Sequence, residues 1–230
     1  MSETSQRQCA GLRDLPALAT AGGMTDPRTE LVGRGYDAMT DTWEAWAAQI
    51  RDDPRHEWCA DLAARLGDGA RMLELGCGGG TAETKSLAER FRVTGVDLSE
   101  RQLERARERL PNAEFVHGDL TSIDFAPSAF DAVVAFYSFN HVPRELLPVV
   151  FERVHGWLVA GGWFMAPLGA GDIEGWIGDF LGAPTFFSSF PPATNTRLLR
   201  EADFELVRDE VVAITEPEGP ARFQWILGRR

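Results

Sequence analysis

The 230-residue sequence contains no long apolar run, only three cysteines and no excess of basic residues. A membrane-spanning helix needs about 20 consecutive apolar residues, and the N-terminus lacks a basic segment followed by an apolar one. Cys9, Cys59 and Cys77 have neither the spacing of a zinc site nor that of a disulfide framework. We therefore expect a cytoplasmic protein with reduced thiols, no metal ion and no membrane partner.

The charge balance argues against nucleic acid as a partner. The formal net charge is −12 and the sequence pI is about 4.8, so phosphate backbones are repelled. The one arginine-rich stretch, residues 99–109, interleaves arginine with glutamate and is predicted to be a helix with a solvated charged face. Ser99 is its expected N-cap, and Pro111 ends it.

The most informative stretch is residues 71–81, a short apolar run that ends in a cluster of glycines. Apolar residues surround a single acid, Glu74, as in a strand buried on both faces. The glycines at positions 76, 78, 79 and 80 permit positive φ and a close approach of the backbone to a ligand. Their spacing differs from the dinucleotide fingerprint G-x-G-x-x-G, because Thr81 occupies the place of its last glycine.

Two further acids follow apolar runs. Asp97 ends residues 93–97, and Asp119 follows residues 115–118. In dinucleotide-binding enzymes an acid at the end of the second strand binds the ribose hydroxyls. Asp97 therefore indicates that the ligand contains a nucleoside, but it does not show which cofactor this is. The alternative is that such acids only cap loops and that the glycines only form a tight turn.

Together these segments resemble the class I S-adenosylmethionine-dependent methyltransferases, whose first motif is an acid followed by Gly-x-Gly-x-Gly. The resemblance covers residues 29–230 and implies S-adenosyl-L-methionine as the cofactor, with Asp97 on the ribose and Asp119 on the adenine amino group. It implies no metal ion. The implied cofactor-binding residues are Tyr36, Glu74, Gly76, Gly78, Gly80, Asp97, Leu98, Asp119, Leu120 and Phe136.

The resemblance also implies the fold. It is a single α/β domain with a doubly wound, Rossmann-like, seven-stranded sheet of order 3-2-1-4-5-7-6, in which strand 7 is antiparallel. Residues 1–28 are expected to be a mobile tail, with Met24 as an alternative translation start. Residues 29–66 are predicted to form cap helices.

The reaction site is expected where the fourth strand, residues 130–136, ends beside the first. Residues 136–142 resemble the family's fourth motif but lack the (Asn/Asp/Ser)-Pro-Pro-(Tyr/Phe) signature of DNA and protein-amide methyltransferases, which favours a small-molecule acceptor. His141 is the candidate catalytic base, and its alternative role is to brace this loop. Asp172 and Glu174 are alternative bases.

Residues 167–194 are predicted to be an insertion rich in glycine, proline and aromatic residues. A solvated loop does not carry this much aromatic surface. The segment therefore either packs as a helical insertion on the sheet or forms the apolar wall and lid of a substrate pocket. The candidate substrate-binding residues are Tyr137, Trp176, Phe186, Phe187 and Phe190.

These features predict methyl transfer from S-adenosylmethionine to a small, aromatic or apolar metabolite by in-line displacement. The protein is expected to supply proximity, a dry pocket and, where needed, a base. The alternatives are a nicotinamide-dependent dehydrogenase and a non-catalytic regulator that binds S-adenosylmethionine. The sequence leaves open whether oxygen, nitrogen or carbon is methylated, and whether the protein is a homodimer.

Overall fold

The computed structural model describes residues 26–230. Of the expected tail, residues 1–28, only the last three positions are among the described residues. Met24 lies outside them. Asp26 caps the first helix by accepting a hydrogen bond from the Arg28 amide at 2.8 Å, and Pro27 stands in its first turn. Residues 26–28, which the sequence assigned to the tail, therefore belong to the cap of α1.

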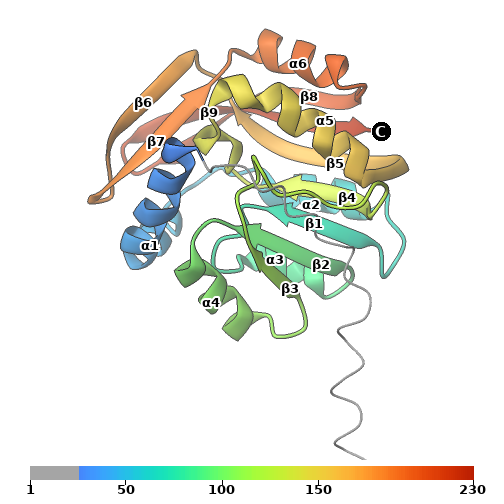
Figure 1. Ribbon diagram of the computed structural model, residues 1–230, viewed down its shortest axis with the longest axis horizontal. Helices are drawn as coiled ribbons and strands as arrows, with labels where there is room; N and C mark the ends of the chain where they lie inside the picture. Colours follow the sequence, from blue (N-terminus) through green and yellow to red (C-terminus); the bar gives the residue numbers. More distant parts are fainter. Residues whose placement is uncertain (1–25) are drawn as a thin grey trace, which may run out of the picture.

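A seven-stranded sheet forms the centre of the molecule (Figure 1). Its order, β3-β2-β1-β4-β5-β9-β8, confirms the predicted 3-2-1-4-5-7-6, because two inserted strands outside this sheet shift the numbering. β9 runs antiparallel to both of its neighbours, as predicted for strand 7. The strands of this sheet are β1 (Arg71–Leu75), β2 (Arg92–Asp97), β3 (Glu114–His117), β4 (Phe130–Ala135), β5 (Leu158–Gly169), β8 (Glu205–Glu216) and β9 (Gly219–Arg229).

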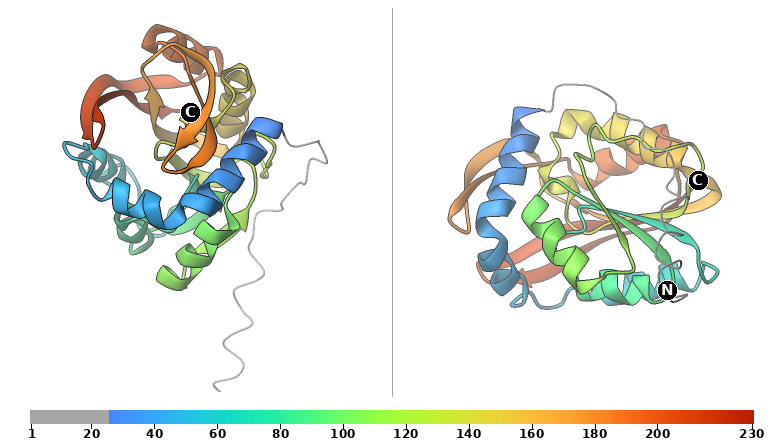
Figure 2. Two further views of the ribbon diagram at one scale, coloured as in Figure 1. Left: turned by 90° about the vertical axis from the view of Figure 1, so that its left-hand side faces the viewer. Right: turned by 60° about the horizontal axis from the view of Figure 1, so that its bottom comes forward.

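Helices cover both faces of the sheet because its central strands are apolar on both sides (Figure 2). In β1, Leu73 and Leu75 pack into the core beneath α5 and α6, whereas Met72 packs into the core of α2 and α3. The helices are α1 (Pro27–Ala47), α2 (Arg55–Ala63), α3 (Ala82–Ala88), α4 (Glu100–Arg109), α5 (Leu147–Trp157) and α6 (Pro192–Glu201), with short 3₁₀ turns η2 (Phe139–His141) and η3 (Arg144–Leu146).

The predicted insertion is a β-hairpin and not a helix. β5 continues to Gly169, and β6 (Ile173–Phe180) and β7 (Ala183–Ser189) then pair as a separate two-stranded antiparallel sheet. The turn consists of Leu181 and Gly182, both at positive φ, which matches the twist of a tight hairpin. β7 packs against α1, so the hairpin and α1 lie side by side (Figure 1).

The arginines of α4 lie on a largely exposed charged face, as the sequence suggested, with Arg101, Arg107 and Arg109 between 43 and 49% exposed. Arg101, Arg105 and Arg109 also pair with acids of α1, and we call this set of contacts the α1–α4 seam. Asp41 accepts from Arg101 at 3.1 Å and also pairs with Arg105, and Glu44 pairs with Arg105 at 3.2 Å and with Arg109 at 2.8 Å. The sequence pattern shows only how the charged residues are spaced along α4, whereas the acids that pair with its arginines lie on α1.

Candidate functional site

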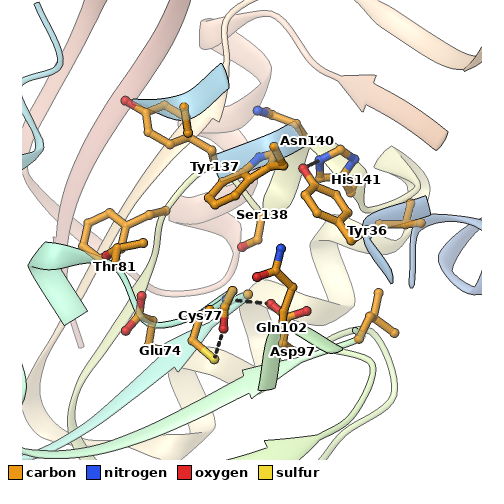
Figure 3. Close-up of a pocket in the computed structure, with 18 of the residues that line it drawn as sticks. Tyr36, Glu74, Cys77, Thr81, Asp97, Gln102, Tyr137, Ser138, Asn140 and His141 are labelled. Atoms are coloured by element: carbon orange, nitrogen blue, oxygen red, sulfur yellow. Dashed lines mark hydrogen bonds between the residues drawn. The ribbon is translucent and has the colours of Figure 1, made fainter. Parts of the chain in front are cut away.

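A cavity of about 690 Å³ lies over the carboxyl ends of β1, β2 and β4, with α1 across it. This volume is within the range of about 300 to 1,000 Å³ that small-molecule sites occupy. The position is the one expected for a doubly wound sheet, where β1 and β4 are neighbours and their connections leave toward opposite sides. Figure 3 shows part of its lining, with side chains from α1, β1, β2, α4 and the segment after β4.

The glycine loop after β1 borders this cavity. Gly76, Gly78 and Gly80 have φ values of +73°, +55° and +73°, a region that favours glycine. A Cβ on Gly76 would stand 2.3 Å from the Cβ of Ser138, so no larger residue fits there. A Cβ on Gly78 would meet no atom within 4 Å, so the Gly78 backbone faces open space. A ligand therefore has room to approach the main chain at this point.

Asp97 and Asp119 lie in the cavity wall with acceptor capacity to spare. Asp97 accepts a hydrogen bond on each oxygen, from the Gly78 amide at 2.8 Å and the Ser99 amide at 2.9 Å. Asp119 accepts from the Thr29 hydroxyl at 2.8 Å on one oxygen, and from Thr121 on the other. Burial raises the pKa of Asp97. Each carboxylate retains lone pairs, which fits the hydroxyl and amino donors of an adenosine.

Glu74 is fully enclosed at the base of the cavity. It is 1% exposed, and its Oε1 accepts from the Thr84 hydroxyl at 3.0 Å. Its Oε2 has no hydrogen-bond partner among residues 26–230. Burial raises the pKa of Glu74 to about 8, so the group is mostly protonated at neutral pH. An unmet carboxyl oxygen at this place suits the ammonium group of a methionine moiety, so the residues present fit S-adenosylmethionine.

Tyr36 and His141 form a hydrogen-bonded pair on the opposite side of the cavity (Figure 3). The Tyr36 hydroxyl lies 2.8 Å from His141 Nε2, and His141 Nδ1 lies 2.8 Å from the Phe186 carbonyl oxygen. A carbonyl only accepts, which assigns the hydrogen to Nδ1 and makes Nε2 the acceptor of the Tyr36 O–H. Burial lowers the pKa of His141 to about 4 and raises that of Tyr36. Both groups are therefore neutral at pH 7.

The cavity brings together most of the residues singled out from the sequence. All ten candidate cofactor residues line it, and so do His141, Tyr137 and Phe187. Trp43 also lines it and meets Tyr36 edge-on with ring centroids 6.2 Å apart. These placements come from six separate segments of the chain, which supports a common site.

Three candidate substrate residues lie outside the cavity lining. Trp176, on β6, is 45% exposed. Phe190 packs against Arg144, whose guanidinium carbon lies 4.9 Å from the centroid of the phenylalanine ring. Phe186 is 2% exposed, with the Arg28 guanidinium 5.4 Å from its ring centroid. Successive side chains of a strand point to opposite faces, so only one of the two adjacent phenylalanines of β7 can face the cavity. The structure places these three side chains outside the cavity lining, and their contact with the acceptor stays a prediction.

The alternative bases also lie outside the lining. Asp172 pairs with Arg144 at 2.6 Å, and Glu174 lies 3.8 Å from the same guanidinium. Both carboxylates are largely exposed to solvent. Their contact is with η3 and not with the cavity.

Sequence reasoning missed the outer part of the cavity, which we call the outer chamber. It is formed by the end of α1, the loop after it and the two hairpins. A backbone bridge between Arg51 and Thr215 joins the loop to β8, and no local signal in the sequence announces this contact. The residues of the outer chamber are Trp46, Ile50, Phe180, Ile214 and Glu216.

Arg55 is a second residue that the sequence did not reveal. Its guanidinium lies between two aromatic rings, 5.4 Å from the centroid of Phe136 and 5.0 Å from that of Tyr137. It pairs with Asp53 at 2.9 Å and Glu83 at 3.5 Å. This cluster fixes the aromatic side chains that follow β4 at the junction of the inner cavity and the outer chamber.

Comparisons with known proteins agree with this site. A family model described as a methyltransferase domain matches residues 72–162, which include β1, the glycine loop and β4. The 27-O-demethylrifamycin SV methyltransferase of Amycolatopsis mediterranei is 29% identical over 175 residues, covering 64% of each chain. The trans-aconitate 2-methyltransferase of Variovorax paradoxus is 38% identical over 119 residues, 49% of this chain and 46% of that one. The chain thus matches less than two thirds of the length of these relatives.

Solved structures share the whole fold. The 1,6-didemethyltoxoflavin N1-methyltransferase of Burkholderia thailandensis, solved with its substrate and S-adenosylhomocysteine, is 22% identical with a TM-score of 0.67. The match covers 93% of this chain and 94% of that one. A [4+2]-cyclase matches with a TM-score of 0.69 at 18% identity, over 90% and 97% of the two chains. Likeness at this identity establishes the fold alone.

No helix in residues 26–230 is long and apolar enough to cross a membrane. Residues 72–162 match a methyltransferase domain, and motif, fold and relatives together support a class I S-adenosylmethionine-dependent methyltransferase.

Proposed function

We propose that this protein transfers the methyl group of S-adenosylmethionine to a small molecule with an aromatic or apolar body. The observation that carries the proposal is one continuous cavity of about 690 Å³ whose inner wall holds the cofactor motifs. Its outer chamber is walled by Trp46, Phe180 and Ile214. Such a chamber is too apolar for a polyanionic acceptor, and the acidic protein repels one.

The bound cofactor supplies an electrophilic methyl group on a sulfonium. The chain's own contribution is to bind, to orient and to exclude water. The glycine loop and Asp97 fix the adenosine end, and α1 covers the cavity so that the reacting atoms meet away from bulk water. The aromatic faces of Tyr36 and Trp43 favour a neighbouring cation by about 0.5 to 2 kcal/mol.

His141 is proposed to position Tyr36, and its role as general base stays a prediction. An acceptor hydroxyl or ammonium reaches Nε2 only by displacing the Tyr36 O–H, which already occupies that lone pair at 2.8 Å. A pKa of about 4 also makes the imidazole a weak base. The geometry therefore supports catalysis by proximity with an acceptor that is nucleophilic on its own.

Glu216 suggests where the polar end of the acceptor lies. Among residues 26–230, its side chain has neither a hydrogen bond nor an ion pair, unlike the other carboxylates that line the cavity. Partial burial and the neighbouring Glu218 raise its pKa. We infer that the acceptor carries a hydrogen-bond donor on the side away from the methylated atom, and that this donor meets Glu216.

Calorimetric titration with S-adenosylmethionine, S-adenosylhomocysteine and NAD tests the cofactor. We expect both sulfur compounds to bind and NAD not to bind. Incubation with a metabolite extract and labelled S-adenosylmethionine, followed by mass spectrometry, then identifies the methylated product. Binding of the cofactor without transfer to any extract component would favour the non-catalytic regulator, and tight binding of NAD alone would overturn the proposal.

A further inference from the structure

Asn140 is a polar side chain of the cavity wall that the protein does not use for its own structure. Its polar neighbours after β4 are all engaged: the Tyr137 hydroxyl donates to Asp53 at 2.9 Å, and the Ser138 hydroxyl donates to a main-chain carbonyl of β1 at 2.7 Å. Both ring nitrogens of His141 also have partners. The amide of Asn140 makes no hydrogen bond with any of residues 26–230, although it lines the same cavity (Figure 3).

The two ends of this amide lie in different surroundings. Oδ1 is buried without a partner and lies 3.0 Å from the point where a Cβ of Gly169 would stand, so it faces an apolar CH₂ group. Nδ2 also lacks a partner among residues 26–230, but the protein does not enclose it. Because the residue lines the cavity, the amide presents its N–H donors to the space that a ligand fills.

Asn195 shows how the same protein treats an amide that serves the fold. It is 1% exposed, and its Nδ2 donates to the carbonyl oxygens of Gly169 and Phe190 at 3.1 and 3.2 Å and to Gln224 at 3.1 Å. The two amides thus flank one glycine, one with its donors used and the other with its donors free. A free donor is hydrated in an open cavity and loses that hydration when an apolar ligand fills the space. A ligand that offers this donor no oxygen therefore binds weakly.

We propose that Asn140 determines acceptor specificity by donating a hydrogen bond to an oxygen of the acceptor. The inference rests on the proposed function and narrows its substrate class. A carbonyl or hydroxyl oxygen fits the donor, whereas a hydrocarbon edge leaves it unmet. The acceptor is then an aromatic or apolar molecule with two polar groups, an oxygen that meets Asn140 and a donor that meets Glu216 in the outer chamber.

Two probes of the same shape measure this hydrogen bond. 2-Acetylnaphthalene and 2-isopropenylnaphthalene differ only in an oxygen that replaces a CH₂ group. Each is titrated into protein saturated with S-adenosylhomocysteine and followed by ligand-observed NMR. In Asn140→Ala the affinity for the acetyl compound should fall about three- to tenfold, because one neutral hydrogen bond is removed. The isopropenyl compound should bind wild type and variant within about twofold. The lost bulk affects both probes alike, so the comparison isolates the amide.

The stability of the protein without ligands separates this role from a structural one. Asn140→Ala removes no hydrogen bond within residues 26–230, so its melting temperature should stay within about 2 °C of wild type. Asn195→Ala is the matched control: its melting temperature should fall by about 5 °C or more, and its affinity for 2-acetylnaphthalene should stay within about twofold of wild type. Asn140→Asp at pH 8 repeats the titration with a side chain of the same shape that lacks the N–H donors.

Equal changes of affinity for the two naphthalenes in Asn140→Ala overturn the inference. A melting temperature that falls as far in Asn140→Ala as in Asn195→Ala overturns it as well, because the amide would then serve the fold. Failure of the wild-type protein to bind S-adenosylhomocysteine, or of that complex to bind either naphthalene, would instead reject the proposed function, so the two failures are distinguishable.

Discussion

At the scale of single residues, Glu74 makes stability depend on pH. Its pKa is about 8 in the folded protein, against about 4.3 in an unfolded chain, so between these values the folded state holds one proton more. Stability without cofactor therefore falls as pH rises from about 4.5 to 8, by at most about 1.4 kcal/mol per pH unit.

Glu74→Gln should remove this slope, because an amide has the shape of the protonated acid and does not ionise. We expect the variant to match the wild type near pH 5 and to be more stable near pH 8. Urea denaturation without cofactor at pH 5, 6.5 and 8 checks this. A constant difference between the two proteins across that range would mean that Glu74 does not titrate within it.

His141 offers a second test at this scale. Both of its ring nitrogens are engaged and its pKa is about 4, so we expect His141→Asn to keep the single-turnover rate within about threefold between pH 7 and 8. The release of Tyr36 should instead weaken cofactor binding. A rate reduced by about 100- to 10,000-fold with cofactor affinity intact would restore the general base hypothesis.

At the scale of elements, the β6–β7 hairpin separates two neighbouring phenylalanines. Phe187 lines the cavity, so Phe187→Ala should raise the acceptor's KM about tenfold while cofactor affinity stays unchanged. Phe186 is buried away from the lining, so Phe186→Ala should lower the melting temperature by several degrees with an unchanged KM. Steady-state kinetics and thermal scans of the two variants suffice. Equal rises in KM would place both rings at the acceptor.

The strands and the cofactor wall could be predicted from the sequence because their signals are local. Glu74, Asp97 and Asp119 each lie at or next to the end of a short apolar run, and parallel strands bring such ends to one rim. The hairpin could not be predicted in this way, since aromatic residues mixed with glycine fit a helix, a strand or a lid equally well. Trp176 and Phe187 are cross-strand partners in this hairpin, yet only Phe187 lines the cavity.

The outer chamber shows the same limit. Trp46 and Glu216 are 170 positions apart in the chain, and both line the cavity because the end of α1 and the loop after it contact the β8–β9 hairpin, through Trp46–Glu218 and Arg51–Thr215.

At the scale of the whole molecule, some of the many acidic residues pair with arginines of a neighbouring helix. α1 carries Asp41 and Glu44 toward the arginines of α4, and its first turn binds Asp119 through Thr29. α1 is therefore attached at both ends to elements of the cofactor wall. The pairs of the α1–α4 seam lie near the surface, where salt weakens them.

We expect the α1–α4 seam to set the residence time of the cofactor. Because α1 lies across the cavity, the cofactor is predicted to leave when this helix separates, and added salt should hasten that event. We expect the dissociation rate constant to increase several-fold between about 0.05 and 0.5 M NaCl. Stopped-flow displacement, followed by the fluorescence of Trp43 and Trp46, measures it. In Asp41→Asn/Glu44→Gln, departure should be fast at every salt concentration, whereas a salt-independent wild-type rate would point to an exit that leaves α1 in place.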